Sequence, residues 1–190
     1  MKKNILINLD GYQHFTLTNP LKKIIDELNL NFAFHCVSLQ DKYLIKKNFP
    51  RIENVFCHEE FFFNNFNRLN IFEYESVLEN LNLEKNDIDR CFNEYSKYYL
   101  RQFISKKKKS EISKKRVLIN FKFYSHLFDK FNPDFVIHEH SGGEASNIFW
   151  ELCKKNNCRY YFFKALYFDK KFYFLDHENF SNPFFDKDKL

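Results

Sequence analysis

The feature that most constrains the fold is an alternation of short apolar runs with longer amphipathic segments at the start of the chain. The runs Asn4–Asp10, Phe32–Ser38 and Asn54–Cys57 are short and mostly apolar, which is typical of buried strands. After the first run, Pro20 is expected to open a helix with an apolar face, and residues 40–47 form a second short helical segment. This β-α-β-α-β order predicts a parallel sheet with right-handed crossovers.

The middle of the chain is predicted to be a helical insertion over about residues 70–131. Apolar residues recur at helical spacing from Ile88 to Phe103 and again from Val117 to Phe131. Asn132-Pro133 is expected to end the second helix, because proline disfavours helical geometry in the residue before it.

The last third returns to alternating strands and helices. Asp134–His140 and Cys158–Phe163 are predicted strands, and the spacing of Ile148, Phe149, Leu152 and Cys153 predicts a helix between them. We therefore predict a single α/β domain over residues 1–190, a Rossmann-like parallel sheet with flanking helices. Asn4–Asp10 and Asp134–His140 are expected to be central neighbours, because both are apolar runs that end in polar loops.

The positive charge of the chain has a local origin. The net charge is +5, and the segment Lys106–Arg116 alone holds seven basic residues and one glutamate. We interpret this segment as an exposed loop, with peripheral attachment to an anionic membrane as the functional hypothesis. No aromatic residue interleaves these charges, so nucleic acid is not a predicted partner.

Apolar runs and cysteines indicate the cell compartment. The longest apolar runs, such as Tyr160–Phe163, are far shorter than the roughly 20 residues that a bilayer requires. The amino-terminal run is interrupted by Asn8 and Asp10, which argues against a signal peptide. Five scattered cysteines form no recognised zinc or redox motif, so we expect buried, reduced thiols in a cytoplasmic protein.

Glycine marks two loops. The chain has three glycines, and Gly11, Gly142 and Gly143 all lie just after predicted strands. Glycine permits positive φ and a close approach of the backbone to a ligand, although a tight turn alone also explains it. The sequence holds neither a G-x-G-x-x-G nor a Walker motif, so no nucleotide cofactor is predicted.

Polar and titratable side chains gather at the same two loops. The first loop offers Asp10 and His14, and the second holds a longer set: His138, Glu139, His140, Ser141 and Glu144. His138 and His140 share one face of their strand, which is a possible arrangement for a metal. Because no further ligand pattern appears, we predict hydrogen-bonded histidines that line a cleft, and no metal.

Two segments resemble a known family. DGYQHFTLTNPLKKIIDEL resembles the first strand, loop and helix of GT-B glycosyltransferases, where a Gly, a His, a helix-opening Pro and a Leu-rich helix follow in that order. PDFVIHEHSGGEASNIFWELCKKNNCRYYFFKALYFDKKFYFLDH resembles the amino-terminal domain of bacterial capsular and surface polysaccharide biosynthesis glycosyltransferases. Together the two segments cover roughly a third of the chain.

The resemblance implies an acceptor-binding domain that takes a glycan or a lipid-linked acceptor. A nucleotide-sugar donor would be held mainly by a second Rossmann domain, which we do not expect within these 190 residues. His14 matches the position of the catalytic base in some inverting members, although Tyr12 and Gln13 separate it from Gly11. Asp10 would orient His14, and Gly11 together with the His138–Glu144 segment would bind substrate.

Two other functions remain open on the sequence alone. The first is a non-catalytic Rossmann-like module that binds a partner or a glycan during polysaccharide assembly. The second is a small metal-dependent hydrolase that uses His138 and His140.

Overall fold

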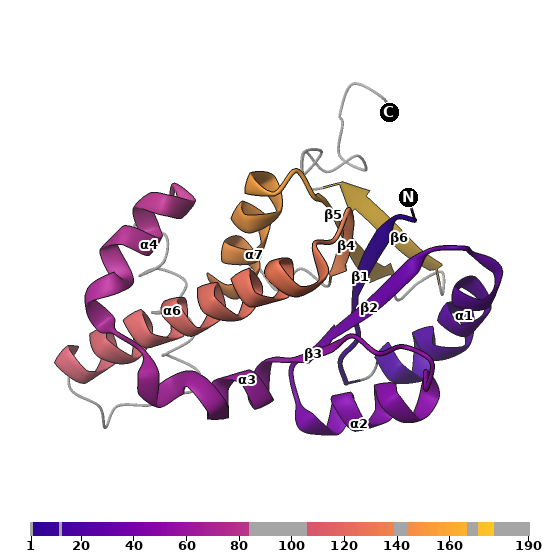
Figure 1. Cartoon of the computed structure of the whole chain (residues 1–190), viewed down its shortest axis with the longest axis horizontal. Helices are drawn as coiled ribbons and strands as arrows, with labels where there is room; N and C mark the ends of the chain where they lie inside the picture. The colour runs from indigo at the N-terminus through magenta and orange to yellow at the C-terminus, as the bar shows by residue number, and fades with distance from the viewer. Residues whose placement is uncertain (1, 12, 84–105, 139–143, 167–170, 177–190) are drawn as a thin grey trace.

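The structure is a computed structural model of the whole chain, and it describes residues 2–11, 13–83, 106–138, 144–166 and 171–176. Its first five elements are a strand, a helix, a strand, a helix and a strand, as predicted (Figure 1). They are β1 (Asn4–Asn8), α1 (Gln13–Glu27), β2 (Asn31–Cys36), α2 (Leu39–Asn48) and β3 (Val55–Cys57).

Helix α1 begins earlier than predicted. It starts at Gln13 and keeps Pro20 inside it, whereas we expected Pro20 to open the helix. A proline inside a helix removes one hydrogen bond and costs about 3 kcal/mol. The longer helix brings the partly buried Leu17 against the same hydrophobic cluster as Leu21, beside β1 and β2, and this burial opposes the cost.

A helical connection joins β3 to the next strand. It comprises α3 (His58–Asn65), the short 3-10 helices η1 (Phe66–Arg68) and η2 (Ile71–Glu73), α4 (Tyr74–Leu81) and α6 (Lys106–Phe131). The helical insertion is confirmed, but it starts directly after β3 and not near residue 70. The helical pattern from Ile88 to Phe103 lies outside the described residues.

The basic segment Lys106–Arg116 is not a loop, because it forms the first turns of α6. Lysine and arginine are good helix formers, so their charge does not prevent a helix. Ser113 and Val117 are buried on the face that α6 turns to the core, and this face continues the apolar stripe seen from Val117 onward. The buried stripe continues into the basic segment through Ser113, a small polar residue. The periodicity of apolar residues therefore did not reveal the first turns of the helix.

The carboxyl-terminal part completes the sheet. It comprises β4 (Phe135–His138), α7 (Glu144–Lys155), β5 (Arg159–Leu166) and β6 (Lys171–Asp176). Asn132 has a left-handed backbone with φ of 46° and ends α6, as the Asn-Pro pair predicted. The strand order is β3-β2-β1-β4-β5-β6, and β6 alone of these strands is antiparallel to its neighbour. The fold is therefore an α/β Rossmann-like sheet, with β1 and β4 as central neighbours.

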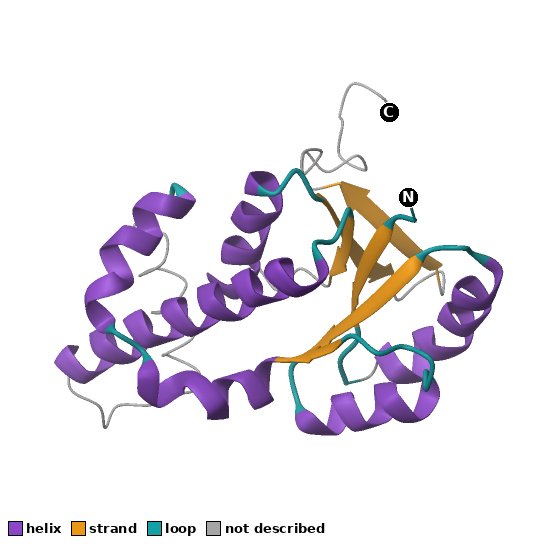
Figure 2. Cartoon of the chain, viewed as in Figure 1, coloured by secondary structure: helices purple, strands orange, loops and turns teal. Residues whose placement is uncertain are grey.

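Helices cover both faces of the sheet (Figure 2). On one face α4, α6 and α7 pack against Leu6, Ala33 and Val136. On the other face residues of α1 and α2 pack against Ile7 and Phe34. Strand residues therefore alternate between two hydrophobic clusters, as expected for a sheet that is buried on both sides.

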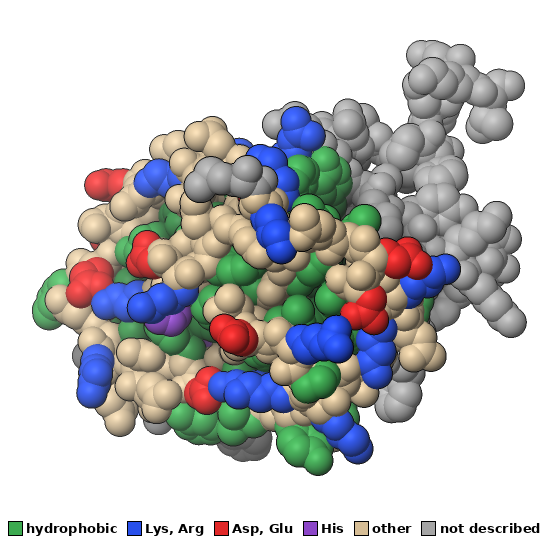
Figure 3. All heavy atoms as spheres, turned by 45° about the vertical axis from the view of Figure 1, so that its right-hand side comes forward, with side chains coloured by type: hydrophobic (Ala, Val, Ile, Leu, Met, Phe, Trp, Pro, Cys, Tyr) green, Lys and Arg blue, Asp and Glu red, His purple; other side chains and the backbone are tan. Residues whose placement is uncertain are grey.

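Figure 3 shows the charged side chains on one face of the molecule. On this face, Lys and Arg side chains are interspersed with Asp and Glu.

Cys36, Cys57, Cys153 and Cys158 are buried free thiols, as predicted, and Cys91 lies outside the described residues. No helix in the described part of the chain has the length and apolar character that crossing a membrane requires.

Candidate functional site

The candidate site lies where β1 and β4 end side by side. The chain runs from β1 outward to β2 and β3, and then returns through β4 to build the other half of the sheet. This reversal is the topological switch point of the fold, where open α/β sheets bind ligands beyond the carboxyl ends of their strands. The two glycine-containing loops of the sequence directly follow these two strands.

The loop after β1 is held against the loop after β2. Asp10 accepts hydrogen bonds from the backbone N–H of Val37 and from the Asn8 side chain, each at 2.5 Å. The backbone N–H of Gly11 donates to the Asp41 carboxylate at 2.9 Å. Ser38 caps α2 and also donates to Asp41 at 2.5 Å. The carboxylates of Asp10 and Asp41 thus hold together the loops at the carboxyl ends of β1 and β2, beside the switch point.

Gly11 has the backbone geometry that the sequence suggested. Its φ is +47°, in the left-handed region that favours glycine. A Cβ added at this residue would meet no atom within 4 Å. The backbone conformation therefore favours glycine at this position, whereas the surrounding described residues leave space for a side chain.

A cluster of buried polar side chains lies near the carboxyl ends of the same strands. His35 of β2 and His138 of β4 stack with ring centroids 5.6 Å apart and planes 5° from parallel. The hydroxyl of Tyr160 on β5 lies 2.9 Å from Nδ1 of His138. Asn8 of β1 makes a long contact of 3.4 Å with Nδ1 of His35. Phe149 of α7 packs edge-on against both histidine rings and covers the cluster.

Burial disfavours the charged forms of His35 and Tyr160. Burial, with smaller contributions from His138 and His58, holds the pKa of His35 well below its ordinary value. Burial likewise raises the pKa of Tyr160, so its phenol stays protonated and able to donate. Among the described residues, Nε2 of His35 has no hydrogen-bond partner. A buried polar atom of this kind is uncommon in folded proteins and marks the cluster as unusual.

A third histidine, His58, lies at the start of α3. Its Nε2 is 2.7 Å from the side-chain oxygen of Asn120 on α6. Burial and the positive charge of Arg116 lower the pKa of His58, although the hydrogen bond to Asn120 acts in the opposite direction. His58 is partly buried, and its ring packs edge-on against Phe123 of α6.

The structure brings together only part of the predicted site. Asp10 and Gly11 lie at the carboxyl end of β1, and His138 ends β4 beside it but is buried. His14 is the second residue of α1, and Glu144 is the first residue of α7, so both lie at helix starts next to the edge. The side chains of His14 and Glu144 lie outside the described residues, as do Glu139, His140, Ser141, Gly142 and Gly143.

Sequence reasoning missed His35 and Tyr160. Each stands inside an apolar run, where a polar residue appears to be a minor interruption of the strand. A signal was present, since His35 lies near the carboxyl end of the strand that pairs with β1, in register with Asn8. His140 lies outside the described residues, so the hypothesis of a metal at His138 and His140 is not tested by the structure. Among the residues that the structure does describe, no group of three or more metal-ligating side chains occurs.

Comparison with known proteins supports the fold alone. The sequence matches no family model, and no curated protein matches it. Among solved structures, the chain is similar to a CDPS from Fluoribacter dumoffii, with a TM-score of 0.50 and 8% identity. The match covers 83% of this chain and 87% of the other. At this identity the likeness indicates a shared arrangement of strands and helices.

Proposed function

We propose that this chain is the acceptor-binding domain of a GT-B-type glycosyltransferase that acts in capsule or surface polysaccharide biosynthesis. The observation that carries the proposal is the switch point between β1 and β4. Of the two segments that resemble this family, the first begins just after β1 and the second contains β4. These strands pair in parallel, so their carboxyl ends lie side by side. The buried cluster and the carboxylate bonds below them provide a rigid base for a ligand site.

In this proposal His14 acts as the general base. A neutral imidazole accepts the proton of an acceptor hydroxyl as the hydroxyl oxygen bonds to the anomeric carbon of the donor sugar. The bond from that carbon to the phosphate oxygen of the donor breaks, and the nucleotide leaves with the bonding electrons. Its place in the first turn of α1, directly after the loop of β1, supports the role. Gly11 and the residues from His138 to Glu144 would form the walls of the acceptor site. The donor would be held mainly by a second domain, as in other GT-B enzymes.

The proposed place of action is the cytoplasmic face of the inner membrane, where lipid-linked acceptors reside. The first turns of α6 supply the charge for attachment there, with Lys106–Lys109 at the start of the helix. Lys114 and Lys115 farther along take part in ion pairs with Glu75 and Glu111, so they are less available to lipid. The four lysines at the start of α6 are therefore the proposed contact.

Nuclear magnetic resonance of the isotope-labelled 190-residue chain tests this function. Oligosaccharide repeat units of surface polysaccharides should shift the amide signals of Asp10, Gly11 and the start of α7. Nucleotide sugars should bind weakly or not at all. Micromolar binding of a nucleotide sugar to this chain alone, or oligosaccharide shifts confined to another face, would contradict an acceptor-binding domain.

Replacement of Gly11 provides a matched variant. Gly11→Asn keeps the left-handed backbone accessible, since Asn82, Asn132 and Asn157 adopt it elsewhere in this protein. The new side chain projects into open space at the edge, so oligosaccharide binding should weaken about fivefold while stability changes by less than about 1 kcal/mol. Asn157→Gly is the control. It alters a left-handed residue just before β5, at the amino-terminal end of the strand and away from the proposed site, so it should leave oligosaccharide binding unchanged.

A further inference from the structure

A second candidate ligand site lies at the outer edge of the sheet. A pocket of about 500 Å³ opens there between β3, α3 and α6, and this volume suits a small molecule. β2 separates β3 from the switch point between β1 and β4, so the pocket is a separate place on the molecule. The proposed function does not involve it.

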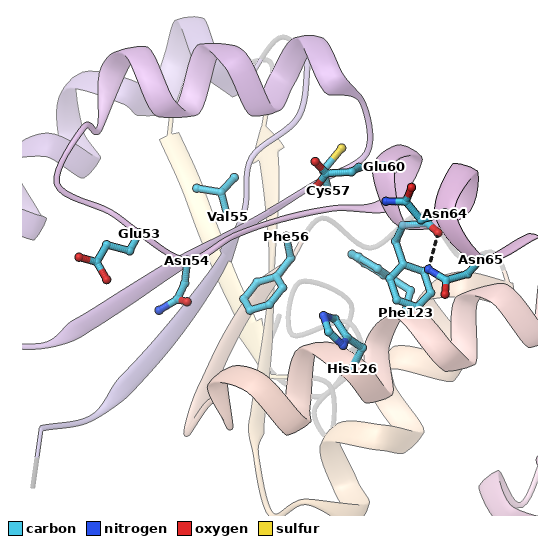
Figure 4. Close-up of a pocket in the computed structure, with 11 residues that line it drawn as sticks. Glu53, Asn54, Val55, Phe56, Cys57, Glu60, Asn64, Asn65, Phe123 and His126 are labelled. Carbon is cyan, nitrogen blue, oxygen red and sulfur yellow. Dashed lines mark hydrogen bonds between the residues drawn. The ribbon is translucent and has the colours of Figure 1, made fainter.

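Aromatic rings form the inner wall of the pocket. Figure 4 shows Phe56 on β3 and His126 on α6 pointing toward one another, with Phe123 beside them. The rings of Phe56 and His126 are 6.4 Å apart, and Phe61 of α3 lies 5.5 Å from both His126 and Phe123. Packing between three elements therefore fixes this wall in place.

Amide groups form the polar part of the pocket. Asn54 lies at one end, and Asn64 and Asn65 lie on α3 at the other end (Figure 4). The side-chain amide of Asn65 donates a hydrogen bond to the backbone carbonyl of Phe61 at 2.8 Å. β3 is also the edge strand, and an edge strand presents backbone N–H and C=O groups on its outer side.

The charge of the pocket favours a neutral ligand. Two carboxylates line it, but Glu60 forms an ion pair with Lys42 at 2.5 Å and Glu53 is exposed at the rim. The described residues that line the pocket include neither lysine nor arginine, so a phosphate or a carboxylate lacks a cationic partner. A peptide added to β3 is also disfavoured, since the strand has only three residues.

We propose that this pocket binds a neutral saccharide. The apolar C–H face of a sugar ring packs on Phe56, Phe61 and His126, and its hydroxyls exchange hydrogen bonds with the amides of Asn54 and Asn64. Both amides donate and accept, which matches the hydroxyl groups of a sugar. The open shape of the pocket leaves room for the rest of a glycan chain to extend into solvent.

Saturation-transfer resonance experiments with the 190-residue chain test the proposal. The probes are neutral mono- and disaccharides of glucose, galactose and N-acetylglucosamine, with a lysine-containing tripeptide as the cationic comparison. We expect at least one saccharide to bind in the millimolar range and to shift the side-chain amide signals of Asn54 and Asn64. Absence of saccharide binding, or tighter binding of the tripeptide, would overturn the proposal.

Substitution of Asn64 separates this pocket from other binding surfaces. Asn64 is an exposed residue of α3, so Asn64→Phe should fill the pocket without loss of fold and weaken saccharide binding about tenfold. Asn19→Phe makes the same change on exposed α1 and should have no effect. If Asn64→Phe leaves saccharide binding unchanged, the proposal that this pocket binds saccharide is overturned. Shifts of the signals around Gly11 in that case would place saccharide binding at the switch point alone.

Discussion

His35 places a titratable ring in the middle of a hydrophobic core. It is 2% exposed and lies among Phe123, Tyr124, Phe149 and His138. A purely structural role would be served by an apolar residue of similar size, without the cost of an unpaired nitrogen. The histidine instead makes the stability of the fold sensitive to pH.

Stability should fall as pH drops below 6.5, the ordinary pKa of histidine. The pKa of His35 is lower in the folded state, because burial disfavours its charged form. The unfolded chain therefore binds a proton at a pH where the folded chain does not. Each such histidine contributes a slope of up to about 1.4 kcal/mol per pH unit between its folded pKa and 6.5, and His58 adds to it in the same direction.

Urea denaturation between about pH 7.5 and about pH 5 measures this slope. His35→Gln removes one titrating group and should make the decrease in unfolding free energy shallower by up to about 1.4 kcal/mol per pH unit. A slope that is the same in both proteins would mean that His35 is protonated equally in the folded and unfolded states.

Helix α6 combines a core-facing stripe with a basic start. Ser113, Val117, Asn120, Tyr124 and Leu127 are buried at helical spacing along it. Lys114 and Lys115 lie over the rings of Tyr74 and Phe66, at 5.0 Å and 5.2 Å. These cation–π contacts attach the basic turns to η1 and α4 and use part of their charge within the protein.

Sedimentation with lipid vesicles tests membrane attachment by the start of α6. Vesicles with anionic lipid should pellet the protein at low salt, and changing Lys106–Lys109 to Gln should abolish pelleting. Each lysine near an anionic surface contributes about 1 kcal/mol, and glutamine keeps the helix propensity of lysine. Salt should weaken attachment, because it screens the charges.

An equal loss of charge elsewhere is the control. Lys22, Lys23, Lys46 and Lys47 are exposed on α1 and α2, so their change to Gln should leave pelleting intact. If both quadruple variants lose attachment equally, net charge and not the start of α6 carries the interaction.

The fold buries the four cysteines that the structure describes. Cys36 and Cys57 stand opposite one another on β2 and β3, and Cys153 and Cys158 are buried near the end of α7. Burial raises the pKa of Cys36 and of Cys153, so little reactive thiolate forms at neutral pH.

These four thiols should react with Ellman's reagent only as fast as the domain unfolds. In urea, all five cysteines should react at once, and in buffer the four buried ones should be slow. Cys→Ser variants, made singly, assign each phase of the reaction. Rapid labelling of Cys36 or Cys153 in the folded protein would show that the sheet or α7 opens locally.

Sequence alone predicted the five parallel strands, their order along the chain and the class of fold, but it did not reveal the antiparallel β6. Short apolar runs and helical periodicity are local signals, and the order of β1 to β5 along the chain follows from them. Adjacency of β1 and β4 was predictable too, since apolar strands that end in polar loops belong at the centre of such a sheet. Pro20 misled, because packing of neighbouring residues outweighed its local preference. The lysines before Val117 misled because their charge indicated a loop, whereas lysine is a good helix former.

Only the tertiary structure decided which polar side chains meet. His35, His138 and Tyr160 come from three strands, and more than a hundred residues separate the first two. No local pattern records such contacts, because strand register and the packing of α6 and α7 bring the side chains together. The same holds for the pocket beside β3, whose walls come from α3 and α6 and exist only once the helices cover the sheet. Local periodicity specifies elements, whereas long-range packing assembles a site.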